Sequence, residues 1–293
     1  MQMILIASRI YFIDDRYVMS DSEPEWFKIE EFSFYWNVDG EKFKKKIRAY
    51  KNLLIAGFPP MGNIIPYHLK ELLKDSEKVV SLYSYDFPPM AEAREEEFEI
   101  PHDELWYSEE KRLFCYVGKY PETEYIPKSA YKQAEGVAQL ARALHVTELY
   151  TIGVILPSQK PFREQKGEVE AYIGYFEGSK KELPRGLKKM TRKNIGRYTI
   201  IRKTGLLPGF ASKLGIESYS ILGVGSYPDD LRACARALRA FKKLSRVDVE
   251  TTKLEEMLKQ SAEAVEARIQ KEREKAVYRG EGVGAEPSQY MYG

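Results

Sequence analysis

The sequence predicts an α/β fold in which a largely parallel sheet is covered by helices on both of its sides. The first observation is that short apolar runs alternate along the chain with longer segments of helical periodicity, the order typical of such a sheet. The second is that the clearest of these runs is apolar on both faces, as expected for a strand buried between two helix layers. The third is length, because 293 residues can bury a sizeable core.

Composition indicates a soluble, cytoplasmic protein and favours no particular charged partner. Lysine and arginine total 46 against 44 aspartates and glutamates, so the chain is nearly neutral. The two cysteines, Cys115 and Cys234, lie in apolar stretches, and we expect buried thiols in a reducing compartment rather than a disulfide. Residues 1–7 have no basic start, and their apolar run is too short for a signal peptide or a membrane span, so we expect no membrane partner.

The first part of the chain is typical of strands at the edge of a sheet, followed by the start of an α/β unit. Between residues 32 and 38, apolar and polar side chains alternate with the period of a half-buried strand, and Asp39-Gly40 then marks a turn. An apolar run at 53–57 predicts the first buried strand, and a helical stretch follows to about Lys74.

The turn between that strand and that helix, residues 58–62, has two interpretations. Glycine and proline before a helix can expose backbone N–H groups that hold a phosphate at the helix N-terminus. No Gly-Lys-Ser/Thr follows, however, and the spacing fits neither a P-loop nor a dinucleotide-binding fingerprint. We therefore favour a tight turn that packs the helix on the sheet.

Three further strands and a helix are expected between residues 79 and 156. Apolar runs at 79–85, 113–117 and 149–156 predict the strands, the last of them apolar on both faces. A stripe of small and apolar side chains spaced three and four apart predicts a helix over 129–144. A strongly acidic patch follows the first of these strands and consists of Glu92, Glu95, Glu96, Glu97 and Glu99.

Residues 180–203 carry the sharpest charge asymmetry in the chain, with ten basic residues against one acid, Glu182. One interpretation is nucleic-acid binding, but the segment has no aromatic stacking platform and no recognised module. A second is a docking surface for an acidic protein or for the acidic patch of a sister subunit. A third is a solvated loop and helix. We expect protein contacts and no nucleic-acid partner. The basic residues are Lys180, Lys181, Arg185, Lys188, Lys189, Arg192, Lys193, Arg197, Arg202 and Lys203.

Residues 205–245 return to the alternation of helices and strands. A glycine-bounded turn at 205–210 is expected to enter a short helix that ends near Gly215. An apolar run at 218–224 predicts a strand. Pro228 ends that strand, and Asp229 or Asp230 caps a helix whose apolar stripe consists of Leu231, Ala235, Leu238 and Phe241.

The last forty residues form a charged helix and a glycine-rich tail. The helix runs from Leu254 to about Tyr278, and its apolar stripe fades beyond Ile269, where we expect it to leave the body. We therefore divide the chain into an α/β core at 1–250, a charged projecting helix at 251–279 and a flexible tail at 280–293. The stripe consists of Leu254, Leu258, Ala262, Val265 and Ile269.

The chain ends in Met291-Tyr292-Gly293, a terminus that a partner could capture. The carboxylate would bind a cation or backbone amides, the tyrosine would fill a slot, and the methionine would fill a neighbouring apolar pocket. Chain ends are commonly loose and without function. With 43% hydrophobic residues and 21 tyrosines among 293 residues, this ending arises by chance about 3% of the time.

Three features occur in register along the chain. They are the strand and turn at 54–62, the turn and helix at 205–215 leading into Ile216-Glu217-Ser218-Tyr219-Ser220-Ile221-Leu222-Gly223, and Tyr227-Pro228-Asp229 opening an alanine-rich helix. Together they resemble the archaeal branch of the proteasome assembly chaperone 2 family over roughly residues 50–270. The chain departs from the family at Asn63, where a second glycine is common, and in its basic segment.

This resemblance implies a three-layer α/β/α fold with a mixed sheet, similar to nucleoside phosphorylases. It also implies a homo-oligomer, for which we favour a tetramer and next a pentamer, that engages the proteasome. Proteasome activators and assembly chaperones commonly end in hydrophobic-Tyr-X, which inserts between neighbouring α-ring subunits of the core particle. The last three residues match that motif. By the resemblance, the Gly293 carboxylate pairs with a pocket lysine, Tyr292 packs at the pocket wall and Met291 fills an apolar niche.

The alternative is an enzyme of the phosphorylase-like fold that acts on a small molecule. An active site needs reacting groups brought together, yet His68, His102 and His145 lie in or beside ordinary structural segments and lack partners at metal-ligand spacing. The sequence has no Gly-x-Ser-x-Gly and no nucleotide-binding fingerprint. We therefore expect an ATP-independent proteasome activator or assembly chaperone, with no cofactor, no metal and no enzyme activity.

Overall fold

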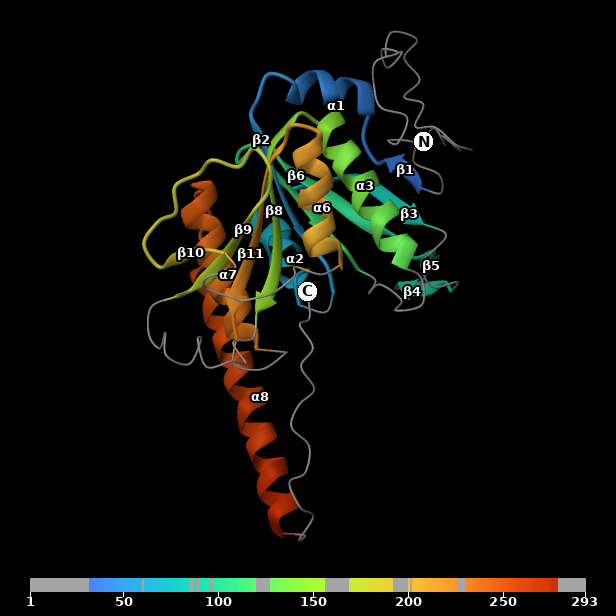
Figure 1. Ribbon diagram of the computed structural model, residues 1–293. Coiled ribbons are helices and arrows are strands. Elements are labelled where there is room, and N and C mark those ends of the chain that lie inside the picture. Colours follow the sequence, from blue (N-terminus) through green and yellow to red (C-terminus); the bar gives the residue numbers. More distant parts are fainter. Residues whose placement is uncertain are drawn as a thin grey trace.

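The computed structural model describes residues 32–59, 61–84, 87, 90–94, 97–119, 127–155, 169–191, 200, 202–225 and 230–278. Within these residues nine strands form one mixed sheet, flanked by helices on both faces (Figure 1), so the α/β fold class is confirmed. These strands are β1 (Phe32–Trp36), β2 (Asn52–Gly57), β3 (Glu77–Ser84), β6 (Asp103–Ser108), β7 (Leu113–Val117), β8 (Val146–Ile155), β9 (Ala171–Tyr175), β10 (Leu187–Lys189) and β11 (Glu217–Val224). Their order across the sheet is β1-β3-β6-β7-β2-β8-β11-β9-β10.

The centre of the sheet is parallel, whereas its flanks are mostly antiparallel. β2 pairs in parallel with β7 and β8, and β8 pairs in parallel with β11. On one flank β1 pairs antiparallel with β3, β3 with β6, and β6 with β7. On the other flank β9 runs antiparallel to β11, and β10 pairs in parallel with β9. The prediction of a largely parallel sheet therefore holds for the central strands and is wrong for the flanks, where, for example, the short connection of residues 109–112 joins β6 to β7 as an antiparallel pair.

Helices divide between the two faces of the sheet. α3 and α6 pack against each other on one face, and α2 and α7 cover the other face, with α8 packed against α7 (Figure 1). α1 follows the edge strand β1 and is capped at its N-terminus by Asp39, whose carboxylate accepts a hydrogen bond from the Lys42 backbone N–H. The expected turn at Asp39-Gly40 is thus the cap of a helix. The bounds are α1 (Gly40–Ile47), α2 (Ile64–Leu72), α3 (Pro127–Ala143), α6 (Arg202–Lys213), α7 (Leu231–Ser245) and α8 (Thr252–Tyr278).

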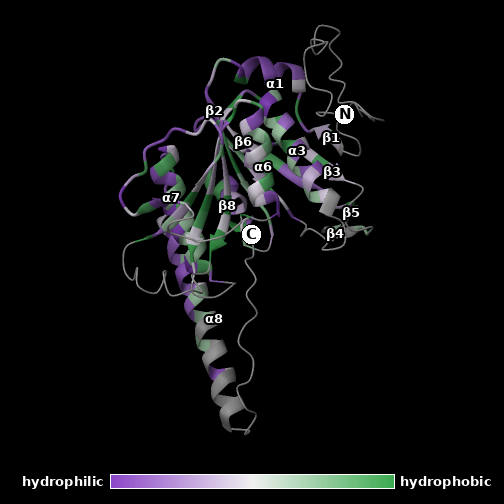
Figure 2. Ribbon diagram, in the orientation of Figure 1, coloured by the Kyte–Doolittle hydropathy of each residue, from purple (hydrophilic) through white to green (hydrophobic). Residues whose placement is uncertain are grey.

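The core consists of two main apolar clusters, one on each side of the sheet. Because successive side chains of a strand point to opposite faces, Ile55 packs toward α2 and α7, while Leu54 and Ala56 pack toward α3 and α6. Hydrophobic residues accordingly follow the central strands, while hydrophilic residues gather on the outer helices (Figure 2). Cys115 and Cys234 are buried and free, as expected, and burial raises the pKa of the Cys234 thiol to about 12.

Two glycines explain the turn between β2 and α2. A Cβ atom on Gly57 would lie 1.9 Å from the Gly62 carbonyl oxygen, and one on Gly62 would lie 2.5 Å from the Ile152 carbonyl oxygen. Neither position has room for a side chain, so the backbone of the turn packs directly on β2 and β8. This is the geometry of the tight turn that the sequence favoured over a phosphate-binding loop.

The turn expected at 205–210 is wrong, because these residues lie inside α6, with Pro208 in the helix interior. Proline removes one backbone donor, so the carbonyl of Thr204, four residues earlier, loses its helical partner. The hydroxyls of Thr151 on β8 and Ser220 on β11 donate to that carbonyl at 2.7 and 2.8 Å. Two strand side chains therefore replace the missing hydrogen bond, and the helix continues through the proline.

Candidate functional site

The C-terminal helix α8 is fixed at its base by α7. Thr251, which is buried just before the helix, accepts a hydrogen bond from Lys242 Nζ at 2.9 Å and donates one to Glu255 at 2.8 Å. Glu255 also pairs with Arg239, whose Nη1 lies 3.2 Å from Oε2 of Glu255. These contacts join successively earlier residues of α7 to successively later residues of α8, so the two helices are antiparallel.

The apolar side of α8 is buried against the body only over its first part. Leu254, Leu258 and Ala262 are buried, whereas Met257 on the same stretch is 40% exposed. The contact of Lys242 with Thr251 fixes how the two antiparallel helices are aligned. Leu231, the first residue of α7, comes eleven residues before Lys242, and Ala262 of α8 comes eleven residues after Thr251, so these two residues lie at the same level. The packing of α8 on α7 therefore ends near Ala262, and the rest of α8 extends past the first residue of α7.

Beyond Ala262, no other helix or strand that the structure describes lies against α8, whose far part projects from the body (Figure 1). The described side chains past this point belong to Glu263, Ala264, Ala267 and Lys271, and all of them are exposed. Sixteen residues separate Ala262 from the end of the helix at Tyr278, which corresponds to about 24 Å at 1.5 Å per residue. The end of α8 at Tyr278 therefore lies well away from the sheet.

The predicted binding residues, Met291, Tyr292 and Gly293, lie outside the described residues. Val265 and Ile269 of the predicted stripe belong to α8, but their side chains also lie outside the description.

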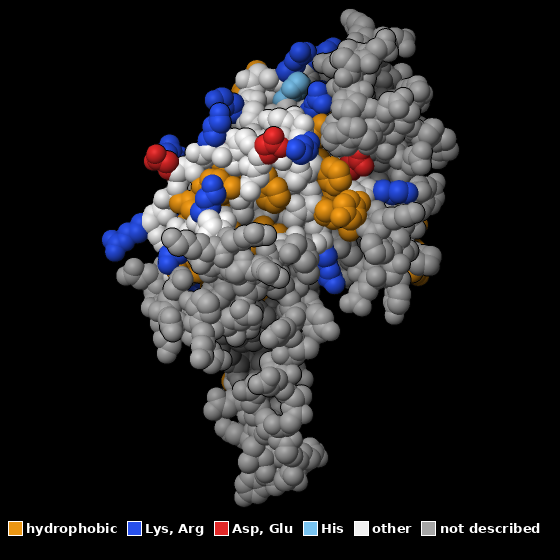
Figure 3. Space-filling model, viewed as in Figure 1, with side chains coloured by type: hydrophobic (Ala, Val, Ile, Leu, Met, Phe, Trp, Pro, Cys, Tyr) orange, Lys and Arg blue, Asp and Glu red, His pale blue; other side chains and the backbone are white. Residues whose placement is uncertain are grey.

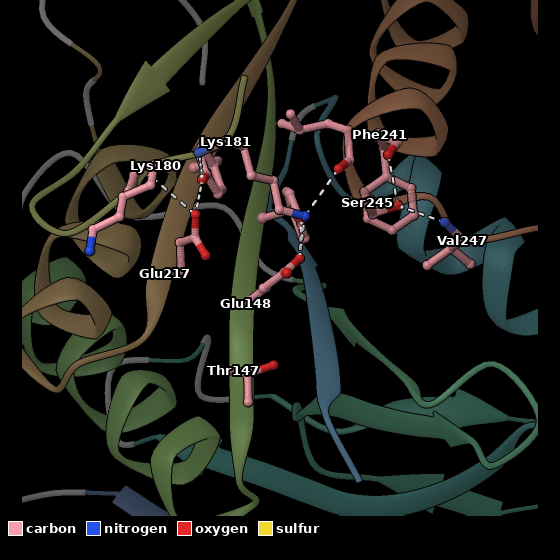
Figure 4. Close-up of polar contacts among 12 residues, drawn as sticks. Thr147, Glu148, Lys180, Lys181, Glu217, Phe241, Ser245 and Val247 are labelled. Atoms are coloured by element: carbon pink, nitrogen blue, oxygen red, sulfur yellow. Dashed lines mark hydrogen bonds and ion pairs between the residues drawn. The ribbon is translucent and has the colours of Figure 1, made fainter. Parts of the chain in front are cut away.

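A polar network at the amino end of the central strands holds the other end of α7. Lys181 Nζ donates to Glu148 Oε2 at 2.6 Å, to the Tyr150 hydroxyl at 2.7 Å and to the Leu244 carbonyl at 3.0 Å (Figure 4). Burial, aided by the neighbouring Glu148 carboxylate, raises the pKa of Tyr150 well above its ordinary value, so the hydroxyl stays protonated and donates to Glu148. The Leu244 carbonyl belongs to the last turn of α7, where helix carbonyls favour a cation.

The same network fixes the chain on either side of Lys181. The backbone N–H of Lys181 donates to the Tyr219 hydroxyl at 3.0 Å, and that of Lys180 donates to Glu217 Oε1 at 3.0 Å (Figure 4). The Lys181 carbonyl accepts from Tyr175 in turn. The interpretation of residues 180–203 as a solvated loop and helix is therefore wrong for this part, because Lys181 is built into the fold.

Lys203, the last of the ten basic residues, is also internal, being 1% exposed. Its Nζ donates to Gln133 Oε1 at 2.7 Å and lies 4.8 Å from the centre of the Phe58 ring. Nearby Asp103 is fully buried and accepts from the Tyr116 hydroxyl at 2.6 Å and from a backbone N–H at 2.8 Å. Burial raises the pKa of Asp103, and the charge of Lys203 acts in the opposite direction.

This cluster lies at the carboxyl ends of the parallel strands, the edge where α/β proteins commonly bind ligands. Sequence reasoning did not assign a site here, because its members come from distant parts of the chain. Their polar groups bond mainly to one another, which is the arrangement of a structural network.

Glu104, next to Asp103, forms a largely buried ion pair with Lys119. Its carboxylate accepts from Lys119 Nζ at 2.7 Å and from Trp106 Nε1 at 3.0 Å, and His102 Nε2 lies 3.5 Å away. Burial raises the pKa of Glu104, but the nearby His102 ring and the hydrogen bonds from Lys119 and Trp106 outweigh it and hold the pKa well below its usual range. The carboxylate is therefore ionised at neutral pH.

The histidines occupy separate places in the described structure. His68 contacts Glu71 on α2, the Nδ1 of His102 contacts the Ile100 carbonyl, and His145 follows α3 with a left-handed backbone, φ 52°. Among the described residues, no three His, Cys, Asp or Glu side chains are grouped as a metal site. No helix in the described ranges is both long enough and apolar enough to cross a membrane.

The fold has solved relatives. Pyrococcus furiosus PbaB, an archaeal proteasome activator, is similar with a TM-score of 0.63 and 20% identity, over 83% of this chain and 99% of PbaB. PbaA of the same organism, an archaeal homologue of proteasome-assembly chaperone, is similar with a TM-score of 0.54 and 16% identity, over 78% of this chain and 95% of PbaA. A Thermoplasma acidophilum protein of unknown function is similar with a TM-score of 0.56 and 14% identity, over 81% of this chain and 94% of that protein. At these identities the likeness shows the fold alone.

Sequence comparison identifies the family. No curated protein matches the chain. A sequence model of the PAC2 family matches residues 54–272, which are 219 of the 293 residues and include most of β2, all the later strands of the sheet and most of α8. The chain therefore belongs to the PAC2 family.

Proposed function

We propose that this protein docks on the α-ring of the proteasome core particle through its C-terminal tails and acts as an ATP-independent activator or assembly chaperone. Its structural relatives include an archaeal proteasome activator and an archaeal homologue of proteasome-assembly chaperone. The observation that carries the proposal is α8, which is anchored to α7 as far as Ala262 and then projects beyond the other described helices and strands. A core at 1–250, an arm at 251–279 and a tail at 280–293 are the parts that this function uses.

The tail supplies three recognition elements in the order that a pocket between two subunits can read. The Gly293 carboxylate pairs with a lysine, Tyr292 packs at the wall, and Met291 fills an apolar niche. The twelve residues between Tyr278 and Met291 reach about 20 Å as a flexible coil, by random-coil scaling. Added to the free part of α8, this reach lets the terminus enter a pocket while the body stays outside.

Several tails on one oligomer would raise the affinity of a weak single tail. Once one tail is bound, the others search a small volume, so their effective concentration is high. We favour a homotetramer, with a pentamer next. The chain has no P-loop or dinucleotide fingerprint to power unfolding, so we expect faster hydrolysis of short peptides and unfolded chains, and no gain for folded substrates.

The test compares Tyr292→Ala and deletion of Gly293 with the matched control Tyr290→Ala, which makes the same change two residues away. Loss of an aromatic anchor typically costs about 2 kcal/mol or more, roughly 30-fold in affinity for each tail. Deleting Gly293 moves the carboxylate one residue out of register and should be nearly as damaging. Co-sedimentation with the core particle and peptide hydrolysis measure both effects. Undiminished binding by both variants, or an equal loss with Tyr290→Ala, contradicts the tail mechanism.

A further inference from the structure

The outer face of α3 and α6 carries exposed aromatic side chains. Tyr131 on α3 is 55% exposed, and its ring packs edge to face against that of Phe210 on α6, with the ring centres 6.4 Å apart. Leu206, one turn before Phe210, is also partly exposed. Figure 3 shows hydrophobic side chains gathered over these two helices. A group of exposed apolar side chains marks a contact surface.

Exposure alone does not say what covers such a surface. Phe98 and Ile100, in and just after the small ribbon formed by β4 (Glu92–Arg94) and β5 (Glu97–Glu99), are more exposed than Tyr131. The feature that distinguishes the outer face of α3 is a carboxyl group that the described part of the chain leaves without a partner.

This carboxyl group belongs to Glu135. It lies one turn after Tyr131 on the same face of α3, because residues four apart on a helix are neighbours. Its Oε1 atom is shielded from solvent and accepts no hydrogen bond from the described residues. Burial raises the pKa of the Glu135 carboxyl, which is the shift expected where no cation offsets the loss of water. A shielded acceptor without a donor costs free energy, so binding of a donor from outside the chain is favoured.

A donor occurs on the same face of α3 but at the wrong distance. Arg142, in the last turn of α3, is exposed and follows Glu135 by seven residues, which is close to two full turns. The rise between the two residues is about 10.5 Å at 1.5 Å per residue. Side chains on a helix also lean toward its N-terminus, so that Glu135 leans away from Arg142. The two charges are therefore held apart within one chain.

A second copy related by a two-fold rotation brings the two charges together. When two α3 helices pack antiparallel about an axis between residues 138 and 139, position 135 of each copy lies opposite position 142 of the other. We propose that the protein pairs with a second copy of itself through α3 in this way, with Glu135 of each copy bound to Arg142 of the other. A guanidinium group binds a carboxylate through two parallel hydrogen bonds and stacks on aromatic rings. Tyr131, one turn from Glu135, supplies such a ring.

This contact has a consequence for the number of subunits. Each copy contributes the same surface, so the contact is isologous and joins subunits in pairs. Together with a second isologous contact it builds a tetramer of the kind that we favour, whereas no ring of five subunits can be built from it.

Exchanging the two charges tests the contact. Glu135→Arg places cations opposite each other at both ends of the interface, and Arg142→Glu places carboxylates there. Each single full-length variant should therefore lose the contact and sediment as a particle of about half the wild-type size. The double variant Glu135→Arg/Arg142→Glu restores both ion pairs with reversed polarity and should recover the wild-type size. Sedimentation velocity at micromolar concentration measures size, and circular dichroism shows that each variant is folded.

The matched control is Glu256→Arg, the same change at an exposed residue of α8, which should leave the size unchanged. Tyr131→Ala should raise the dissociation constant of the pair about tenfold or more, because tyrosines are frequent anchors of interfaces. Arg142 is at the surface, so Arg142→Glu keeps the test decisive even if Glu135→Arg disturbs folding.

A monomeric wild type overturns the proposal, as does a wild-type size in Arg142→Glu or a folded double variant that stays dissociated. No proteasome is present in this experiment, so its failure is distinct from failure of the tail mechanism.

Discussion

Truncating Leu258 tests whether the first part of α8 belongs to the folded core. Leu258 is 1% exposed and packs in the cluster that also contains Phe241, Leu244 and Leu254. Leu258→Ala removes three carbon groups, worth about 2.4 kcal/mol at about 0.8 kcal/mol each. The cavity left behind adds to this loss, and we expect the free energy of unfolding to fall by about 3 kcal/mol.

Met257→Ala is the matched control, because it truncates the adjacent side chain on the exposed side of the same helix turn. We expect it to lower the free energy of unfolding by less than about 1 kcal/mol. Urea titration measures both variants. Amide hydrogen exchange shows whether residues 252–262 lose protection in Leu258→Ala, as a released arm would. Equal losses in the two variants would show that α8 does not pack on α7 through Leu258, and the description of the arm would be wrong.

Two further predictions concern charge networks. Lys181→Met leaves Glu148 without its cation and should lower the free energy of unfolding by about 1.5–3 kcal/mol. The control Lys180→Met changes an exposed side chain and should alter the free energy of unfolding little. Urea titration measures both variants, and equal effects would contradict a structural role of the Lys181 network. Because the folded-state pKa of Glu104 is depressed, its stabilisation is present above the unfolded-state pKa of about 4.3 and is lost as pH falls through the lower folded-state value. Glu104→Gln should therefore lower the free energy of unfolding at pH 7 and weaken its decrease as the pH falls below about 4. A decrease in acid as steep as that of the wild type would refute this role of Glu104.

The buried central strands could be predicted because their apolar character does not depend on other parts of the chain. β6 was not predicted, since it begins with Asp103 and Glu104, and two adjacent carboxylates ordinarily indicate an exposed segment. They are buried only because Tyr116 and Lys119 bond to them across the sheet. β10 was missed for the opposite reason, because its lysines follow the charge of an exposed edge rather than the pattern of a core strand.

The arm was predictable in part. The stripe of Leu254, Leu258 and Ala262 identified the side of α8 that is buried. The residue at which α8 stops packing on α7 depends instead on where α7 begins, at Leu231. No pattern within the sequence of α8 encodes the start of α7. Lys203 had no local signal either, because Gln133 lies 70 residues away in the chain and Phe58 farther still.

Lys203→Met decides whether the buried cluster around Lys203 and Asp103, at the carboxyl ends of the parallel strands, serves the fold or is the remnant of a ligand site. Polar groups kept for binding or catalysis commonly cost stability, so removing them tends to stabilise a protein. Removing a buried cation that serves the fold leaves its hydrogen-bond acceptor, here Gln133, unpaired and a nearby buried carboxyl without a compensating charge, at a cost of about 1–3 kcal/mol. Since Asp103 is fully buried and the charge of Lys203 offsets its burial, we expect the second result.

The dependence on pH provides a check within the same variant. The raised pKa of Asp103 means that its neutral form is favoured in the folded state, so its contribution to stability is present at low pH and is lost as pH rises through that pKa. Without Lys203 the cost of the buried carboxylate is larger, and Lys203→Met should lose most stability at neutral pH and less in acid. Adding Asp103→Asn should recover part of the loss at pH 7. Urea titrations at pH 7 and pH 5 measure all three chains, and a Lys203→Met chain as stable as the wild type would favour a small-molecule site at this edge.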